Sequence, residues 1–315
     1  MLHPCRTGKM KMSIIVAYFL IYVVWGSTYY FIGVALNGLP PFLLGALRFT
    51  VAGLILLVIC YKRGEPVFKK SLIKKSAISG IVLLFIDMAV VMLAQCYLSS
   101  SLVAIIASST AIWIMALDVP MWKKNFKNPL VVIGVVVGFL GVMLLYVEQL
   151  EHTSGIEHRE YGVILLIIGC ISWALGTLYA KYRSSAEEEV YAFAGSAWQM
   201  LFASLAFWIC SVIAGDINTS LGQVPISSWL SLLYLVVFGS ILAYTAYVWL
   251  LKVRPATEVA THAYVNPLIA VFLGTIFGNE NITLIQIIGL AVILFSVLLI
   301  GKRKPVKKFL NRISS

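Results

Sequence analysis

The chain has 315 residues, of which 61% are hydrophobic and only 12% are charged, and its mean hydropathy is +0.95. A soluble domain is about 45–50% apolar and about 25% charged, so this composition disfavours a soluble enzyme and excludes a disordered chain, a collagen-like fibre and a disulfide scaffold. The formal net charge of +11 is compatible with a nucleic-acid partner, an acidic lipid surface or a membrane-orientation signal, and the positions of the charges must decide between them.

Ten apolar stretches are each long enough to cross a bilayer as a helix, which takes about 20 residues. They are 13–34, 41–61, 76–97, 101–120, 129–148, 161–181, 191–213, 228–250, 257–278 and 284–301. Pro and Gly at tight joints such as 38–41 predict that one helix ends there and the next begins. The predicted fold class is therefore an all-α membrane protein with ten transmembrane helices.

The basic residues fall almost entirely on one side of this predicted topology. If the first helix starts in the cytoplasm, all of the 24 Lys and Arg except Arg48 and Arg159 lie on the side of both termini. Cytoplasmic loops carry the Lys/Arg excess, so both termini are predicted to lie inside a cell inner membrane. The basic tail 302–315 is then an orientation signal that contacts lipid headgroups, and no nucleic-acid partner is expected.

The two halves of the chain resemble each other in collinear order. Residues 25–29 (WGSTY) match 173–177 (WALGT), and 46–49 (ALRF) match 197–200 (AWQM). Five helices per half is an odd number, so the second half enters the membrane from the opposite side, as in many secondary transporters. The predicted domains are a first repeat at 13–148, an outer linker at 149–160, a second, inverted repeat at 161–301 and the cytoplasmic tail at 302–315.

Several of these motifs resemble one known family, the EamA-type members of the drug/metabolite transporter superfamily. They are 25–29, Pro40-Pro41-Phe42 with Leu47-Arg48-Phe49, and Tyr264-Val265-Asn266-Pro267 with Gly274 and Glu280. The resemblance covers about residues 13–301 and is strongest to bacterial inner-membrane permeases that export metabolites. It implies ten helices, two five-helix repeats, a central cavity and alternating access, with substrates among amino acids, nucleosides, sugars and amphipathic drugs.

The fourth helix departs from the family pattern. Residues 108–111 (SSTA) stand where the first repeat usually has a mid-helix Pro, whereas the second repeat keeps Asn266-Pro267. This departure argues against a gate mechanism that needs both repeats to bend alike.

Two ionisable residues inside helices are expected to have a partner of opposite charge, because a charge at the centre of a transmembrane helix costs about 2.5–3.5 kcal/mol. At 1.5 Å per residue, Arg48 lies about 10 Å and Asp87 about 15 Å from the outer ends of their helices. These depths predict an Arg48–Asp87 ion pair that faces the bundle interior. The sequence leaves open whether such a pair fixes helix packing or binds substrate.

Glu258, His262 and Asn266 recur every four residues and share one face of the ninth helix. Pro267 removes a backbone donor near mid-bilayer, where broken helices commonly hold substrate sites, so we expect Asn266 at the site and Pro267 at a gate. Asp87, Glu258 and His262 are candidates for a proton relay. The alternative for Glu258 is a purely structural role in favour of the helix dipole.

The predicted cavity combines aromatic and polar side chains from several helices. Its members are Trp25, Thr28, Tyr29, Arg48, Asp87, Gln95, Trp173, Trp198, Gln199, Tyr244, His262 and Asn266. Tyr179 and Tyr247 are better explained by the enrichment of Tyr at membrane interfaces.

These patterns favour a secondary transporter that moves small metabolites, amino acids or related amphipathic solutes, with export as the more usual direction. The four His are dispersed, and the chain has no P-loop or Asp-rich motif, so an integral-membrane enzyme is disfavoured and no metal or cofactor is expected. A passive channel or a lipid scramblase remains an alternative. Both a monomer and a homodimer remain open.

Overall fold

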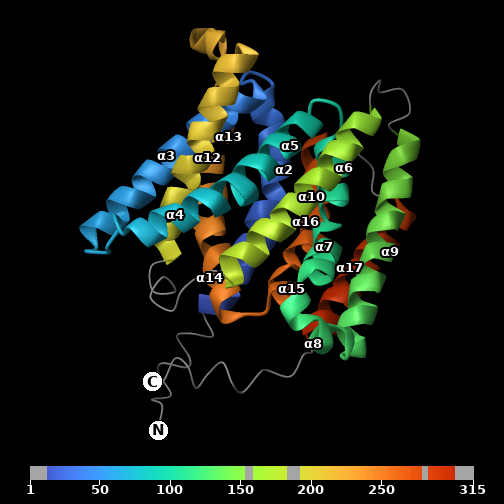
Figure 1. Ribbon diagram of the computed structural model, residues 1–315. Coiled ribbons are helices and arrows are strands. Elements are labelled where there is room, and N and C mark those ends of the chain that lie inside the picture. Colours follow the sequence, from blue (N-terminus) through green and yellow to red (C-terminus); the bar gives the residue numbers. More distant parts are fainter. Residues whose placement is uncertain (1–12, 153–158, 183–191, 279–282, 302–315) are drawn as a thin grey trace.

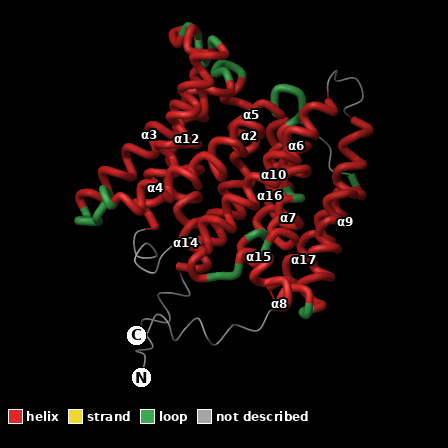
Figure 2. Tube along the Cα trace, viewed as in Figure 1, coloured by secondary structure: helices red, strands yellow, loops and turns green. Residues whose placement is uncertain are grey.

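The computed structural model describes residues 13–152, 159–182, 192–278 and 283–301, and within these ranges it is helical with short loops and no strand (Figures 1 and 2). The basic tail 302–315, residues 153–158 of the predicted linker 149–160 and the family-like Glu280 lie outside the described residues. The elements of the first half are η1 (Leu20–Val24), α2 (Trp25–Leu36), α3 (Pro41–Lys62), α4 (Lys70–Ser79), η2 (Gly80–Ile86), α5 (Asp87–Ala94), α6 (Ser100–Ala107), α7 (Thr110–Leu117), η3 (Val119–Met121), α8 (Trp122–Phe126) and α9 (Pro129–His152). Those of the second half are α10 (Arg159–Tyr182), α12 (Ala192–Ala214), η4 (Asp216–Asn218), η5 (Leu221–Gln223), α13 (Ile226–Tyr234), η6 (Leu235–Tyr244), α14 (Thr245–Val253), α15 (Ala256–Val259), α16 (His262–Gly278) and α17 (Leu284–Gly301).

Eight helical spans in the described part of the chain are long and apolar enough to cross a membrane. They are Ser13–Leu36, Pro41–Lys62, Lys70–Ala94, Ser100–Leu117, Glu160–Tyr182, Phe193–Ala214, Ile226–Val253 and Ala256–Phe277. A ninth results if Val119–Phe126 and Pro129–Leu144, which meet at a bend of 100°, form one span, and α17 adds a shorter apolar run. The all-α membrane fold is confirmed, whereas the count of ten spans is not.

The helices pack in a pattern that brings the two halves of the chain together. α3 packs along α12 on one side of the bundle, and α9 packs along α17 on the other (Figure 1). Between these pairs, α10 lies against η2, α5 and α7, while η1 and α2 lie against α13, η6 and α16. Most of the packing between spans therefore joins residues from opposite halves of the sequence.

Loops gather at two opposite ends of the bundle (Figure 1). At one end, which we call the basic end, Trp198 Nε1 donates a hydrogen bond of 2.6 Å to the carbonyl of Val67, and Lys181 Nζ donates one of 2.8 Å to that of Leu251. The loops and terminal turns at this end hold Lys62, Arg63, Lys69, Lys70, Lys74, Lys75, Lys123, Lys124, Lys127, Lys181, Lys252 and Arg254. At the opposite end the backbone N–H of Phe42 donates a bond of 3.1 Å to Asp216.

Five spans have irregular backbone. Three contain a π-helical segment, namely η1, η2 and η6, and two are interrupted, Ser100–Leu117 at Ser108–Ser109 and Ala256–Phe277 at Ala260–Thr261. A hydroxyl at each interruption bonds to the carbonyl three residues earlier: Ser108 Oγ to Ile105 at 2.6 Å, and Thr261 Oγ1 to Glu258 at 2.7 Å. Such bonds compete with the helical ladder, and the first of these helices breaks without a proline. Both spans are therefore interrupted, although only the second contains a proline.

Candidate functional site

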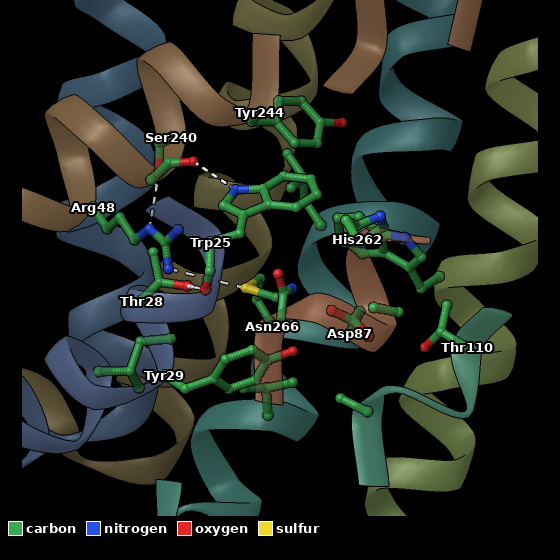
Figure 3. Close-up of a pocket in the computed structure, with 18 of the residues that line it drawn as sticks. Trp25, Thr28, Tyr29, Arg48, Asp87, Thr110, Ser240, Tyr244, His262 and Asn266 are labelled. Atoms are coloured by element: carbon green, nitrogen blue, oxygen red, sulfur yellow. Dashed lines mark hydrogen bonds between the residues drawn. The ribbon is translucent and has the colours of Figure 1, made fainter. Parts of the chain in front are cut away.

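A cavity of about 60 Å³ lies in the middle of the bundle (Figure 3). Every one of the eight spans except Phe193–Ala214 contributes to its wall. The lining side chains combine large aromatic rings, hydroxyls, one guanidinium and one carboxyl: Trp25, Thr28, Tyr29, Ile32, Arg48, Phe49, Leu84, Asp87, Met88, Val91, Ala107, Thr110, Trp173, Gly239, Ser240, Tyr244, His262, Ala263 and Asn266. A buried water needs about 10–15 Å³, so the cavity has room for about four water molecules.

The irregular backbone delivers the polar residues to this cavity. Trp25 directly follows η1, Asp87 directly follows η2, and Ser240 and Tyr244 lie within η6. Thr110 and His262 are the first residues after the two interruptions. π-helical turns occur frequently at functional sites, and broken helices line the binding sites of many transporters, because both turn backbone and side chains out of the regular ladder.

Asn266 stabilises the backbone of η1. Its amide nitrogen, assigned from the acceptors around it, donates to the carbonyl oxygens of Ile21 at 3.1 Å, Tyr22 at 3.2 Å and His262 at 3.0 Å. The side chain is only 4% exposed, so these carbonyls have little access to water. Asn266 therefore connects α16 to the π-helical segment that precedes Trp25.

Five ring side chains pack together beside the cavity, and we call them the aromatic layer: Trp25, Trp173, Tyr244, Tyr247 and His262. All of them except Tyr247 line the cavity. The Trp25 ring centroid lies 5.4 Å from that of Trp173, 5.0 Å from that of Tyr247 and 5.1 Å from that of His262. Trp25 Nε1 donates to the carbonyl of Gly239 at 3.0 Å, and Trp173 Nε1 donates to the Tyr247 hydroxyl at 3.1 Å. Tyr247 is fully buried in this layer, so its assignment to a membrane interface is wrong.

Arg48 is held on one side of the cavity (Figure 3). Its Nε donates to Ser240 Oγ at 2.8 Å, its Nη1 lies 3.9 Å from the sulfur of Met88, and its guanidinium carbon stands 5.0 Å from the centroid of the Phe49 ring. These contacts orient the guanidinium toward η6 and supply no carboxylate.

Asp87 lines the other side of the cavity and is 8% exposed (Figure 3). Among the residues that the structure describes, its carboxyl group makes no hydrogen bond or ion pair, and it lies toward α10, where a Cβ added at Gly169 would stand 3.3 Å from Oδ1. The predicted Arg48–Asp87 ion pair is therefore wrong for this structure. Both residues line the cavity, but Arg48 turns toward η6 and Asp87 toward α10.

Nine of the twelve predicted cavity residues line the cavity: Trp25, Thr28, Tyr29, Arg48, Asp87, Trp173, Tyr244, His262 and Asn266. Their role in binding substrate stays a prediction. Ser240 and Thr110 belong to the wall as well, and sequence reasoning missed them. A lone hydroxyl in an apolar helix is a weak signal, because it can bond to its own backbone.

The other three predicted cavity residues lie outside the wall. Trp198 bonds to the Val67 carbonyl at the basic end, and Gln95 Nε2 donates to the carbonyl of Tyr29 at 3.2 Å. Gln199 bonds to Tyr244 and Ser79 from behind the wall. Each makes at least one hydrogen bond in the packing between helices, and periodicity alone does not distinguish such a position from a cavity position.

The structure does not bring Glu258 and His262 of the predicted proton relay together, and the predicted gate residue Pro267 does not lie at the break in its span. Pro267 lies inside α16, and the interruption of that span comes earlier, at Ala260–Thr261. Glu258 accepts a hydrogen bond of 3.1 Å from the Tyr18 hydroxyl and pairs with Arg254 at 3.4 Å, whereas His262 Nδ1 lies 2.8 Å from the carbonyl of Val259. Glu258 and His262 therefore point to separate partners, and of the two only His262 lines the cavity.

Comparison with known proteins gives consistent matches over nearly the whole chain. Residues 12–147 and 160–302 each match the EamA-like transporter family. The chain is 33% identical over 286 residues to the uncharacterized inner membrane transporter YedA of Escherichia coli K12, which covers 90% of this chain and 89% of YedA. It is 24% identical over 279 residues to a probable amino-acid metabolite efflux pump of Salmonella typhimurium, with coverage of 87% and 90%. A crystal structure at 17% identity superposes with a TM-score of 0.75 over 96% of this chain and 99% of its own, which shows a shared fold.

Proposed function

The chain belongs to the EamA-like transporter family, and from this membership and its central cavity we propose that it is a secondary transporter that moves small metabolites across the inner membrane by alternating access. The proposed substrates are amino acids or related amphipathic solutes. Export is the proposed direction, with support from the efflux-pump relative. The observation on which the proposal depends is a central cavity that combines an aromatic layer with the guanidinium of Arg48 and the carboxyl group of Asp87.

Alternating access is proposed because the cavity is small and the two halves of the chain show matching features. The cavity has room for only about four water molecules, so we propose that the helices move apart to admit a larger solute. The two halves, 13–148 and 161–301, each match the family model, and we propose that they are inverted five-helix repeats. Support comes from the matching irregularities: η2 and η6 occupy corresponding spans, as do the interruptions at Ser108–Ser109 and Ala260–Thr261.

We propose that the basic end of the bundle faces the cytoplasm, with both termini on that side. Lys and Arg in short loops favour the cytoplasmic face, and the basic end gathers the Lys and Arg side chains of those loops. The single-cysteine variants Lys123→Cys and Ser220→Cys, in a background without the native cysteines, test this. In intact cells an impermeant maleimide is expected to label the Ser220→Cys variant alone, and labelling of the Lys123→Cys variant alone reverses the proposed orientation.

Proton coupling is the proposed energy source, because Asp87 and His262 are titratable groups on the cavity wall. Glu258 lies off the wall, so its part in the relay depends on movement of α15.

Flux in proteoliposomes tests the carrier proposal. Purified protein is reconstituted and challenged with radiolabelled amino acids, nucleobases, sugars and cationic amines, with protein-free vesicles as the control. A carrier gives saturable uptake that is accelerated by unlabelled substrate on the opposite side. Linear, non-saturating flux of every solute indicates a channel, and flip of labelled lipid indicates a scramblase, and either result overturns the proposal.

A further inference from the structure

Arg48 and Asp87 line the same cavity without neutralising each other. From this arrangement, and resting on the proposed transport function, we propose that the cavity recognises a zwitterion: Arg48 binds the carboxylate of the substrate and Asp87 binds its ammonium group. Figure 3 shows the two side chains on different sides of the space, with Asn266 and Trp25 between them in the view.

The guanidinium of Arg48 has donors to spare. It carries five N–H groups, of which one is used by Ser240 Oγ and another makes a long contact with the sulfur of Met88. The side chain is 4% exposed, so water satisfies little of the remainder. A carboxylate accepts two parallel hydrogen bonds from a guanidinium, which makes it the natural partner for this side of the cavity.

The carboxyl group of Asp87 lacks a hydrogen-bond donor or cation within the described residues. It is more than nine-tenths buried and lines the cavity. Gly169 lets α10 approach Oδ1 closely without covering it, because a Cβ there would stand 3.3 Å away. The same cavity exposes the rings of Trp25, Trp173 and Tyr244, whose faces attract an ammonium group in addition to the carboxylate.

Only a ligand that carries both a carboxylate and an ammonium group pairs with both Arg48 and Asp87. An unpaired ion buried in a protein is costly, and a simple amine leaves Arg48 uncompensated while a simple carboxylate leaves Asp87 uncompensated. A site built to bond a polar group strongly rejects an analogue that lacks it. The two separate charges therefore select for zwitterions against monocations and monoanions.

The test uses matched ligand sets with purified protein in nanodiscs and titration calorimetry. One set is L-alanine, ethylamine and propionate, and the other is L-leucine, isoamylamine and isocaproate, so that each amine or acid lacks one charge of its amino acid. We expect at least one amino acid to bind about 30-fold or more tightly than either analogue, the size expected for loss of a buried charged partner. Comparable affinity across both sets, or no binding by either amino acid, overturns the inference.

Two variants test which residue binds the ammonium group and which binds the carboxylate. Asp87→Asn is expected to remove the advantage of the amino acid over its carboxylic acid, and Arg48→Gln its advantage over the amine. The control Glu160→Gln removes an exposed carboxylate at the start of α10 and is expected to bind like the wild type. If Asp87→Asn is not monodisperse, Asp87→Glu keeps the carboxylate and is expected to keep the preference. Retention of full preference by Asp87→Asn assigns the ammonium elsewhere and overturns the inference.

The same preparations separate this inference from the proposed function. Saturable flux of a sugar or nucleobase without amino-acid binding supports the carrier proposal and overturns the inference of a zwitterion site. Absence of saturable flux for every solute removes the carrier itself.

Discussion

Gln199 holds Tyr244 in place from behind the cavity wall. The Tyr244 hydroxyl donates a hydrogen bond of 2.7 Å to Gln199 Oε1, and Gln199 Nε2 donates one of 2.7 Å to Ser79 Oγ. All three side chains are buried, and they belong to η6, α12 and α4. α12 contributes nothing to the wall directly, so Gln199 is a positioning residue that acts through Tyr244.

Replacement of Gln199 by Leu is therefore expected to orphan the buried Tyr244 hydroxyl. An unsatisfied buried donor costs about 1–3 kcal/mol, so the thermal midpoint in detergent should fall and the apparent KM of transport should rise. Gln95→Leu is the matched control, because Gln95 bonds only to the Tyr29 carbonyl and its Oε1 has no partner within the described part of the chain. Equal losses in the two variants would show that Tyr244 needs no support from α12.

The contact between Asn266 and η1 separates two hypotheses about the gate. Asn266→Ala deprives the carbonyls of Ile21, Tyr22 and His262 of their donor, so we expect a loss of about 1–3 kcal/mol and strongly reduced transport through the displacement of Trp25. Pro267→Ala is expected to change stability by less than about 1 kcal/mol, because the span is interrupted elsewhere and the new N–H can join the helical ladder. Thermal unfolding and uptake by both variants check this. If Pro267→Ala abolishes transport while Asn266→Ala transports normally, the gate depends on Pro267 and not on Asn266.

Close approach of two helices makes one glycine irreplaceable. A Cβ at Gly80 would stand 2.9 Å from the backbone Cα of Gln199, so Gly80→Ala must push α12 away from η2. Overpacking typically costs about 1–3 kcal/mol, and the shift also disturbs the bond between Gln199 and Tyr244. The control is Gly222→Ala, because a Cβ at Gly222 meets nothing within 4 Å. We expect a lowered thermal midpoint and reduced uptake for the first variant alone.

The sequence predicts the helical spans well because apolar length is a direct consequence of bilayer thickness. Their internal breaks were harder to foresee. The interruption at Ser108–Ser109 coincides with a side-chain bond that Ser also makes in intact helices, so the residue type does not mark the break. The π-helical segment η1 contacts Asn266, which lies in the other half of the chain. For the cavity, the sequence placed Arg48 and Asp87 on faces that point into the bundle, and both line the cavity. The prediction that Arg48 and Asp87 form an ion pair was wrong. Their partners depend on how η6 and α10 pack against these two side chains, and residue spacing along the sequence carries no information about that packing.

Glu258 and His262 share a helix face in the sequence but have different surroundings in the fold. Glu258 is held by Tyr18 and Arg254, whereas His262 lines the cavity next to Trp25 and Tyr247. If protons drive transport through the cavity, His262→Gln is expected to flatten the pH dependence of uptake, because glutamine cannot change its charge. Glu258→Gln is expected to keep the wild-type pH profile and to lower stability modestly, since it loses a partly exposed ion pair worth about 1 kcal/mol or less. Uptake from pH 5 to 8 with an imposed gradient measures both. An unchanged profile in His262→Gln removes that residue from the relay, and a flattened profile in Glu258→Gln would mean that α15 moves toward the cavity during transport.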